Sequence, residues 1–246
     1  MATLPLREQY SAYDHDDPIL RTGEGGLTIW VLQKMAQEKR FKELDDLFDN
    51  GVNMNSLPVG YSAGAGVATL EPKLINEKLV NEWMSGFAVN NWRGKIFFSS
   101  NNKRASQGRN RLRSSWVSSR APFVPMMKFS TMLLDTHYLA PRAKSNLVIL
   151  TYTDPLTKPF LQEYLAAKLQ AVDLQVAVKG KYGPVYIGKT WFGKYDKSGK
   201  FTANDPNKVV GRYFLDFNEG ALKEQKESHL DGSDEDVLDQ IPHIDY

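Results

Sequence analysis

The stretch SLPVGYSAGAGVATL (residues 56–70) decides how this chain folds. It holds too many glycines for a stable helix, because each glycine in a helix interior costs about 1 kcal/mol relative to alanine. It also holds too much valine and tyrosine for a plain linker. Gly60, Gly64 and Gly66 allow a strand to coil sharply or another backbone to approach it closely. We therefore predict a strongly bent strand, the kind that lets a sheet curl toward a barrel.

Helical patterns flank this strand on both sides. Before it, LTIWVLQKMAQEKRFKELDDLFDNG (residues 27–51) repeats apolar side chains at helical spacing. This pattern predicts one or two helices that end at Asn50-Gly51, a typical C-terminal stop. After it, EPKLINEKLVNEWMSG (residues 71–86) begins near a proline, places its apolar residues on one face and predicts a further helix.

The second half of the chain is predicted to be mostly strand. Runs that are apolar or alternate between apolar and polar residues lie at 92–98, 126–135, 146–154, 171–180, 184–196 and 209–218. The polar stretch 99–115 predicts a long mobile loop, and the segment 159–170 fits a helix and a strand equally well. The turn DKSG (residues 196–199) is a hairpin signal. Helices packed on an antiparallel sheet predict a mainly β, α+β fold or a capped barrel.

The chain is expected to form one folded domain with two polar ends. Its 246 residues, with 41% hydrophobic and 24% charged side chains, are typical of a globular protein whose core is large enough to be stable without disulfides or structural metal ions. We predict an N-terminal extension over 1–24, a single helix-capped β domain over 25–218, and a short helix with an acidic tail over 219–246.

Several kinds of chemistry lack the residues or motifs they need. The chain has no cysteine, which excludes disulfides, thiolate nucleophiles and Cys-ligated zinc. Its four histidines lack metal-ligand spacing, and Gly64 to Gly66 belong to neither a dinucleotide fingerprint nor a P-loop. We therefore predict no metal and no cofactor. The N-terminus lacks the pattern of a secretory signal, and no apolar run approaches the roughly 20 residues of a membrane span. These observations favour a cytoplasmic protein with no membrane partner.

The order of segments resembles the GXWXG-motif family, which pairs a short GXWXG segment with a strand-rich companion domain. Residues 60–64 (GYSAG) occupy the motif, and residues 92–95 (WRGK) occupy a later tryptophan-glycine-lysine segment. The resemblance spans roughly residues 44–218, and Ser62 stands where the family has its tryptophan. It implies a lipocalin-like antiparallel β-barrel, capped here by the N-terminal helices, with an enclosed cavity. It carries no catalytic residue across to this chain.

Positive charge is concentrated in the middle of the chain. No acidic residue lies between Glu82 and Asp135, whereas this interval contains Arg93, Lys95, Lys103, Arg104, Arg109, Arg111, Arg113, Arg120 and Lys128. One interpretation is a face over residues 93–128 that binds nucleic acid or another anionic partner. The other is a solvated basic loop, which the net charge of only +2 favours because phosphate binding depends on accumulated charge.

Aromatic and basic residues on the predicted strands are the candidates for a ligand site. Strand alternation places Trp92 on one face of 92–98 and both Arg93 and Lys95 on the other. The candidate polar or catalytic groups are Arg93, Lys95, Tyr152, Tyr186, Lys189 and Tyr213, and the candidate ligand-binding residues are Trp92, Phe97, Trp191, Phe214 and His137. Ordinary core packing also explains most of these aromatics. His137 is either a turn residue or an acid-base group tuned by Asp135.

The favoured functional hypothesis is a barrel that encloses an apolar or aromatic small molecule. A shaped cavity that holds a substrate in a reactive conformation suits a cofactor-independent cyclase, isomerase or pericyclase of specialised metabolism. Such an enzyme would use tyrosine, lysine or arginine donors to stabilise developing charge. Two other hypotheses stay open: a non-catalytic carrier of the same kind of ligand, and a nucleic-acid or anionic-partner binder that uses residues 93–128.

Overall fold

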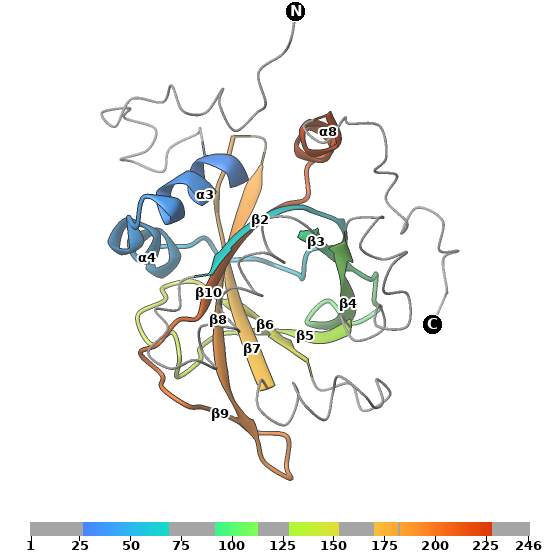
Figure 1. Ribbon diagram of the computed structural model, residues 1–246. Helices are drawn as coiled ribbons and strands as arrows, with labels where there is room; N and C mark the ends of the chain where they lie inside the picture. The colour runs from blue at the N-terminus through green and yellow to red at the C-terminus, as the bar shows by residue number, and fades with distance from the viewer. Residues whose placement is uncertain (1–26, 69–91, 113–127, 153–169, 182, 228–246) are drawn as a thin grey trace, which may run out of the picture.

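A computed structural model describes residues 27–68, 92–112, 128–152, 170–181 and 183–227 (Figure 1). The helices are α3 (Ile29–Gln37), α4 (Phe41–Asp49) and α8 (Glu219–Glu227). The strands are β1 (Gly60–Tyr61), β2 (Ala63–Ala68), β3 (Trp92–Phe97), β4 (Ala105–Leu112), β5 (Lys128–Leu134), β6 (Leu147–Thr151), β7 (Gln170–Lys179), β8 (Pro184–Tyr195), β9 (Phe201–Ala203) and β10 (Gly211–Asp216). The predicted N-terminal extension, the predicted helix over 71–86, most of the segment 159–170 and the end of the acidic tail lie outside the described residues.

The strands form one antiparallel sheet, and the mainly β class predicted from the sequence is confirmed. Its strand order is β1-β3-β4-β5-β6-β7-β8-β10-β2, and β9 pairs with β8 through the predicted turn at 196–199. Among the helices in the described part of the chain, none combines the length and the apolar character needed to cross a membrane.

The glycine-rich segment bends at Ser62 and changes its partner there. On one side of Ser62, β1 pairs with β3, and on the other side β2 pairs with β10. Ser62 itself binds β3, because its backbone N–H donates to the Lys95 carbonyl and its Oγ accepts from the Lys95 N–H, both at 2.9 Å. The predicted bent strand is therefore confirmed. In the described residues no ladder joins β2 to β3, so the sheet is curled but open.

Close backbone approach at this seam explains two of the glycines. Gly94 has φ = +126°, and a Cβ there would lie closer than 3.0 Å to the Ser62 carbonyl oxygen. A Cβ at Gly64 would in turn meet the Gly94 backbone. Helix α8 packs over the seam, where the Gln225 amide donates to the Gly64 carbonyl at 2.9 Å. Glycine at both positions thus lets β2 lie directly against β3.

Helices α3 and α4 cover one face of the sheet, which we call the helix-covered face (Figure 1). Residues 27–51 were predicted to form one or two helices, and they form two. Thr28 caps α3 by accepting a hydrogen bond from the Val31 N–H at 3.3 Å. The core on this face combines apolar residues of the helices and of the alternating strands. Its members include Leu32, Met35, Leu44, Phe48, Val172, Leu174, Val176, Ile187, Trp191 and Phe214.

The opposite face of the sheet is concave. Lys95 on β3 and Asp173 on β7 lie four strands apart in the sheet order, about 19 Å in a flat sheet. Their charged atoms are nevertheless only 3.4 Å apart. The sheet therefore curls around this concave face. A second apolar cluster lies here and includes Trp92, Phe97, Phe129, Leu133, Val148, Leu150, Tyr186, Tyr213 and Leu215.

The prediction of a long loop over 99–115 is wrong for residues 105–112, which form β4. The strand was hidden because its buried positions are not apolar. Asn110 and Arg111 are buried and hydrogen-bonded, and Gly108 leaves room for the ring of Phe129. A strand whose buried positions hold polar side chains and glycine shows no hydrophobic alternation.

On the helix-covered face, the partly exposed Asp45 of α4 binds two buried cations, Lys189 at 2.7 Å and Arg212 at 3.0 Å. Burial alone would raise the pKa of Asp45, but the hydrogen bonds and charges of the two cations lower it. A carboxylate with a lowered folded pKa stabilises the protein above its unfolded pKa, and this contribution is lost as the pH falls through the folded pKa.

Asp45→Asn is therefore expected to lower the free energy of unfolding by about 2 kcal/mol at neutral pH, a value reduced for the partial exposure of Asp45. The variant should also lose less stability than the wild type on acidification. Lys189→Met is the control: it leaves the Asp45–Arg212 pair in place, so it should cost about half as much. Urea unfolding at neutral and acidic pH measures both effects, and equal costs for the two variants would contradict this assignment.

Candidate functional site

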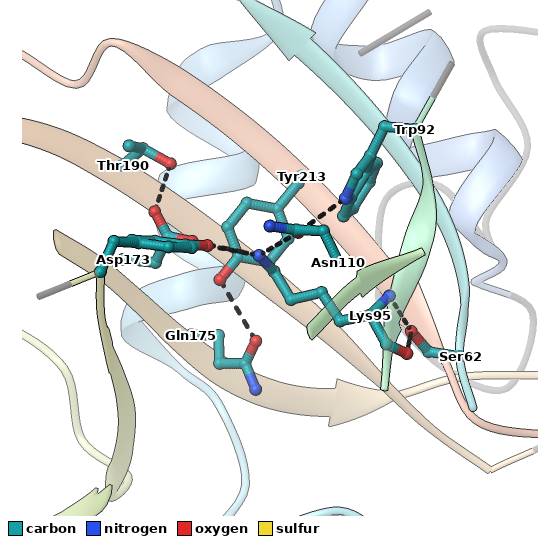
Figure 2. A network of polar contacts seen from close by, with 9 residues as sticks. Ser62, Trp92, Lys95, Asn110, Asp173, Gln175, Thr190 and Tyr213 are labelled. Carbon is teal, nitrogen blue, oxygen red and sulfur yellow. Dashed lines mark hydrogen bonds and ion pairs between the residues drawn. The ribbon is translucent and has the colours of Figure 1, made fainter. Parts of the chain in front are cut away.

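A buried lysine lies at the centre of the concave face (Figure 2). Lys95 is only 2% exposed, and its Nζ donates hydrogen bonds to Asn110 Oδ1 at 2.9 Å and to Tyr152 Oη at 2.6 Å. Tyr152 in turn donates to Asp173 Oδ2 at 2.6 Å. Lys95 and Asp173 also form an ion pair, so Lys95, Tyr152 and Asp173 form a closed triangle of contacts. We call Lys95, Asn110, Tyr152 and Asp173 the Lys95 cluster.

Trp92 lies on the same side of β3 as Lys95, so the prediction that the two point to opposite faces is wrong. The indole N–H of Trp92 donates to Asn110 Oδ1 at 2.9 Å, the same atom that Lys95 binds (Figure 2). The reason is a β-bulge: Trp92 pairs with Leu112 and Gly94 with Arg111, which leaves Arg93 as an extra residue. One inserted residue reverses the alternation that follows it.

Four aromatic rings surround the Lys95 ammonium. Its Nζ lies 4.8 Å from the ring centre of Tyr213, 5.1 Å from Phe129, 5.2 Å from Tyr152 and 5.7 Å from Trp92. Ring faces attract a cation, and the attraction grows when water is excluded. The cage therefore offsets part of the free energy that is lost by removing the ammonium from water.

Side chains of β7 and β8 fix the carboxylate of the cluster. Thr190 donates to Asp173 Oδ1 at 2.7 Å, which leaves Oδ2 to Tyr152 and Lys95. Gln175 follows Asp173 by two positions on β7 and is fully buried. Its Oε1 accepts a hydrogen bond from Tyr213 at 3.3 Å. Its Nε2 has no hydrogen-bond partner among the described residues. The concave face thus presents one unused amide donor beside the cluster.

Burial changes the proton affinities of these groups. It lowers the pKa of Lys95, and the charge of Asp173 opposes this effect only in part. Burial, followed by the charge of Asp173, raises the pKa of Tyr152 and Tyr213 well above 10. Burial also raises the pKa of Tyr186 to about 12. The tyrosines are therefore held as neutral hydrogen-bond donors, while the lysine gives up its proton more readily than a solvated one.

These tyrosines are expected to make the protein labile to alkali. Between pH 10 and their folded pKa values, Tyr152, Tyr186 and Tyr213 ionise in the unfolded chain but not in the folded one. Each then lowers the free energy of unfolding by about 1.4 kcal/mol per pH unit. Lys95 has the opposite effect, because its folded pKa is lowered: its contribution to the free energy of unfolding rises with pH and stops rising near pH 10.5.

Ultraviolet titration of tyrosinate checks this expectation. Each of the three tyrosines is replaced by phenylalanine in turn. While the protein stays folded, the change in tyrosinate absorbance near pH 10 should be as large in each variant as in the wild type. In urea, each variant should lose one tyrosine from the transition at pH 10. A variant that loses native absorbance change near pH 10 would show that its tyrosine is not held neutral.

The structure brings six of the predicted site residues to the concave face. Lys95 and Tyr152 belong to the Lys95 cluster, and Trp92 and Tyr213 lie around its ammonium. Phe97 and Tyr186 are further along the same apolar cluster, linked through the ring of Phe217. In the described part of the basic stretch 93–128, Arg93, Lys95 and Arg111 are each less than 10% exposed.

Five predicted site residues lie elsewhere. Lys189, Trp191 and Phe214 are on the helix-covered face, where Lys189 binds Asp45 and Trp191 donates to the Pro206 carbonyl. Arg93 forms the bulge and donates to the Trp92 carbonyl at 3.3 Å. His137 accepts a hydrogen bond from the Leu139 N–H in a turn, while Asp135 pairs with Arg104.

Sequence reasoning missed Asn110, Asp173, Thr190 and Gln175. Asp173 and Gln175 carried a signal, because both interrupt the strand AVDLQVAVKG on one face while the other face is uniformly apolar. Asn110 carried none, since it lies in a stretch that is polar throughout.

Within the ranges that the structure describes, no three His, Asp or Glu side chains lie together as ligands for a metal ion. No family model, curated protein or solved structure matches this chain. The resemblance to the GXWXG-motif family therefore stays a prediction.

Proposed function

We propose that this chain is a lipocalin-like β-barrel protein that encloses an apolar or aromatic small molecule bearing a carbonyl group, and that it isomerises or cyclises this molecule with its own side chains. The observation that carries the proposal is the Lys95 cluster. An ammonium, a phenol and a carboxylate lie within 3.4 Å of one another, the ammonium and the carboxylate are buried, and aromatic rings surround the ammonium. Binding sites for small molecules combine apolar walls with a few oriented polar groups in this way.

The curl of the sheet supports an enclosing shape. The two ends of the strand order, β1 and β2, are consecutive in the chain, and Ser62 between them is hydrogen-bonded to β3. Pairing of β2 with β3 across this seam would close the sheet into a barrel, and a barrel of about eight strands has an interior wide enough for side chains or for one small ligand.

The aromatic residues of the concave face supply an apolar wall. Edge-to-face contacts run from Tyr152 through Phe129, Phe97 and Phe217 to Tyr186, with ring centres 5.2–5.9 Å apart. A flat or apolar ligand packs well against such rings. The Lys95 cluster lies at one end of this row, where it would meet a polar group of the ligand.

The chemistry follows from the charges of the cluster. The Lys95 ammonium donates to the ligand carbonyl and stabilises the negative oxygen that develops when an adjacent carbon loses a proton. Asp173 accepts that proton, directly or through Tyr152, and returns it to another carbon in an isomerisation. In a cyclisation, the enolate attacks a second electrophilic carbon of the same molecule. Thr190 keeps the carboxylate oriented toward the ligand.

Proton exchange in D2O tests this function without knowledge of the natural ligand. Benzylacetone, an apolar aromatic ketone, is incubated with the protein, and deuterium incorporation next to its carbonyl is followed by NMR. We expect the wild type and Lys189→Met to accelerate exchange over buffer, and Asp173→Asn to lose the acceleration by about a hundredfold or more.

Two outcomes would oppose the enzymatic proposal. Binding of benzylacetone without accelerated exchange would identify a carrier, the non-catalytic alternative. Neither binding nor exchange across a panel of aromatic and aliphatic ketones would leave the Lys95 cluster as an internal structural element.

A further inference from the structure

We propose that Lys95 captures the ligand carbonyl covalently as a protonated imine, with Tyr152 as the proton donor to the departing oxygen and Asp173 as the counter-ion. This inference rests on the proposed function and narrows the substrate class to aldehydes and ketones, because esters and amides do not form imines with an amine.

The geometry of the triangle gives the Lys95 ammonium a route by which it can lose a proton. Lys95 Nζ donates to Tyr152 Oη at 2.6 Å, and Tyr152 donates to Asp173 Oδ2 at 2.6 Å. A proton of the ammonium therefore has a short hydrogen-bonded path to the carboxylate through one phenol. When the proton has moved, Lys95 is a neutral amine, which is the form that attacks a carbonyl.

The surroundings of the Lys95 amine also favour its reaction with a carbonyl. Burial and the aromatic cage keep water from Nζ, which is 2.6–2.9 Å from its two hydrogen-bond acceptors and has four rings within 6 Å. Burial also lowers the pKa of Lys95, which favours the neutral amine, the form that attacks a carbonyl. The iminium product carries the same single positive charge as the ammonium, so the cage and Asp173 stabilise both.

Imine formation at Lys95 needs no oxidant, reductant or other reagent. The amine nitrogen forms a bond to the carbonyl carbon, and one proton moves from this nitrogen to the carbonyl oxygen to give a neutral carbinolamine. Tyr152 then donates a proton to this hydroxyl group, which leaves as water while the nitrogen lone pair forms the C=N bond. In total, the ammonium of Lys95 and one carbonyl compound give one iminium and one water. Tyr152 recovers its proton from Asp173.

The experiment uses the intact wild-type chain with hydrocinnamaldehyde as probe and cyanoborohydride as trapping agent at neutral pH. Digestion and peptide mass spectrometry then locate the reduced adducts. Exposed Lys103 and Lys197 serve as internal controls for solvated amines, and Lys189 as the control for a buried lysine that binds a carboxylate. We expect Lys95 to be modified at least tenfold faster than all three, and this preference to disappear in urea.

A second variant tests the role of the phenol. Tyr152→Phe should slow trapping at Lys95 by about a hundredfold, as expected when a general acid is lost. Its binding of benzylacetone, measured by calorimetry, should fall far less. Modification of Lys95 no faster than of Lys103 and Lys197 would overturn the imine. In that case calorimetry separates the two failures: retained binding of benzylacetone leaves the proposed function standing, whereas lost binding removes both.

Discussion

Lys95→Met is expected to lower the free energy of unfolding by about 3–5 kcal/mol, among the largest losses of any single substitution in this chain. Methionine keeps the approximate length of the side chain and fills the aromatic cage, so little packing is lost. The cost arises because Asp173, 3% exposed, stays buried without its counter-ion. Urea unfolding at neutral pH measures the loss.

The double variant Lys95→Met/Asp173→Asn tests whether the lost stability comes from leaving Asp173 as an unpaired buried charge. Asparagine at 173 keeps one oxygen to accept from Tyr152 or Thr190, and its amide N–H can donate to the other hydroxyl, while both buried charges are removed together. Replacing both members of a buried pair is often neutral, whereas removing one is costly. We therefore expect the double variant to recover most of the lost stability. Costs of the two single substitutions that simply add would show that the two charges are not coupled.

Gly94→Ala is expected to cost about 2–6 kcal/mol, because two effects combine at this position. Its φ of +126° is a conformation that only glycine adopts readily, and forcing another residue into it costs about 1–3 kcal/mol. The added Cβ also meets the Ser62 carbonyl, and such overpacking costs a further 1–3 kcal/mol, roughly. The clash pushes β2 away from β3 and disturbs the hydrogen bonds between Ser62 and Lys95.

Gly183→Ala separates these two effects. Gly183 has a similar φ of +147°, but a Cβ there meets nothing within 4 Å. It should therefore show only the conformational cost, about 1–3 kcal/mol. Thermal or urea unfolding of both variants gives the comparison. If Gly94→Ala were no more destabilising than Gly183→Ala, the close packing of β2 against β3 would not be a source of stability.

Much of the fold could be predicted because its strands carry local patterns. Alternation in YIGKTWF (residues 186–192) puts Tyr186, Gly188 and Thr190 on one face of the strand and Ile187, Lys189 and Trp191 on the other, and the structure has these residues on the same two faces. The glycines of residues 56–70 indicated a bent strand. Its change of partner at Ser62 is a matter of pairing with distant segments, which a local pattern does not contain.

The site was predicted only in part, and two residues explain why. Arg93 is an extra residue in the β3–β4 pairing, so strict alternation assigned Trp92 and Lys95 to opposite faces. Nothing in WRGKIFF marks a bulge except the adjacent glycine. Asn110, which binds both Trp92 and Lys95, lies in a polar strand with no periodic signal. The lysine could be nominated from the sequence, but its surroundings could not.

The most direct test of the central claim is calorimetric titration of benzylacetone into the wild type and into Lys95→Met/Asp173→Asn, which is expected to stay folded. Lys189→Met, altered at a buried lysine on the helix-covered face, is the matched control. If the Lys95 cluster receives the carbonyl of a ligand on the concave face, the wild type and Lys189→Met bind the ketone and the double variant binds it at least tenfold more weakly, a difference of about 1.4 kcal/mol. Equal affinity in all three proteins would contradict the account.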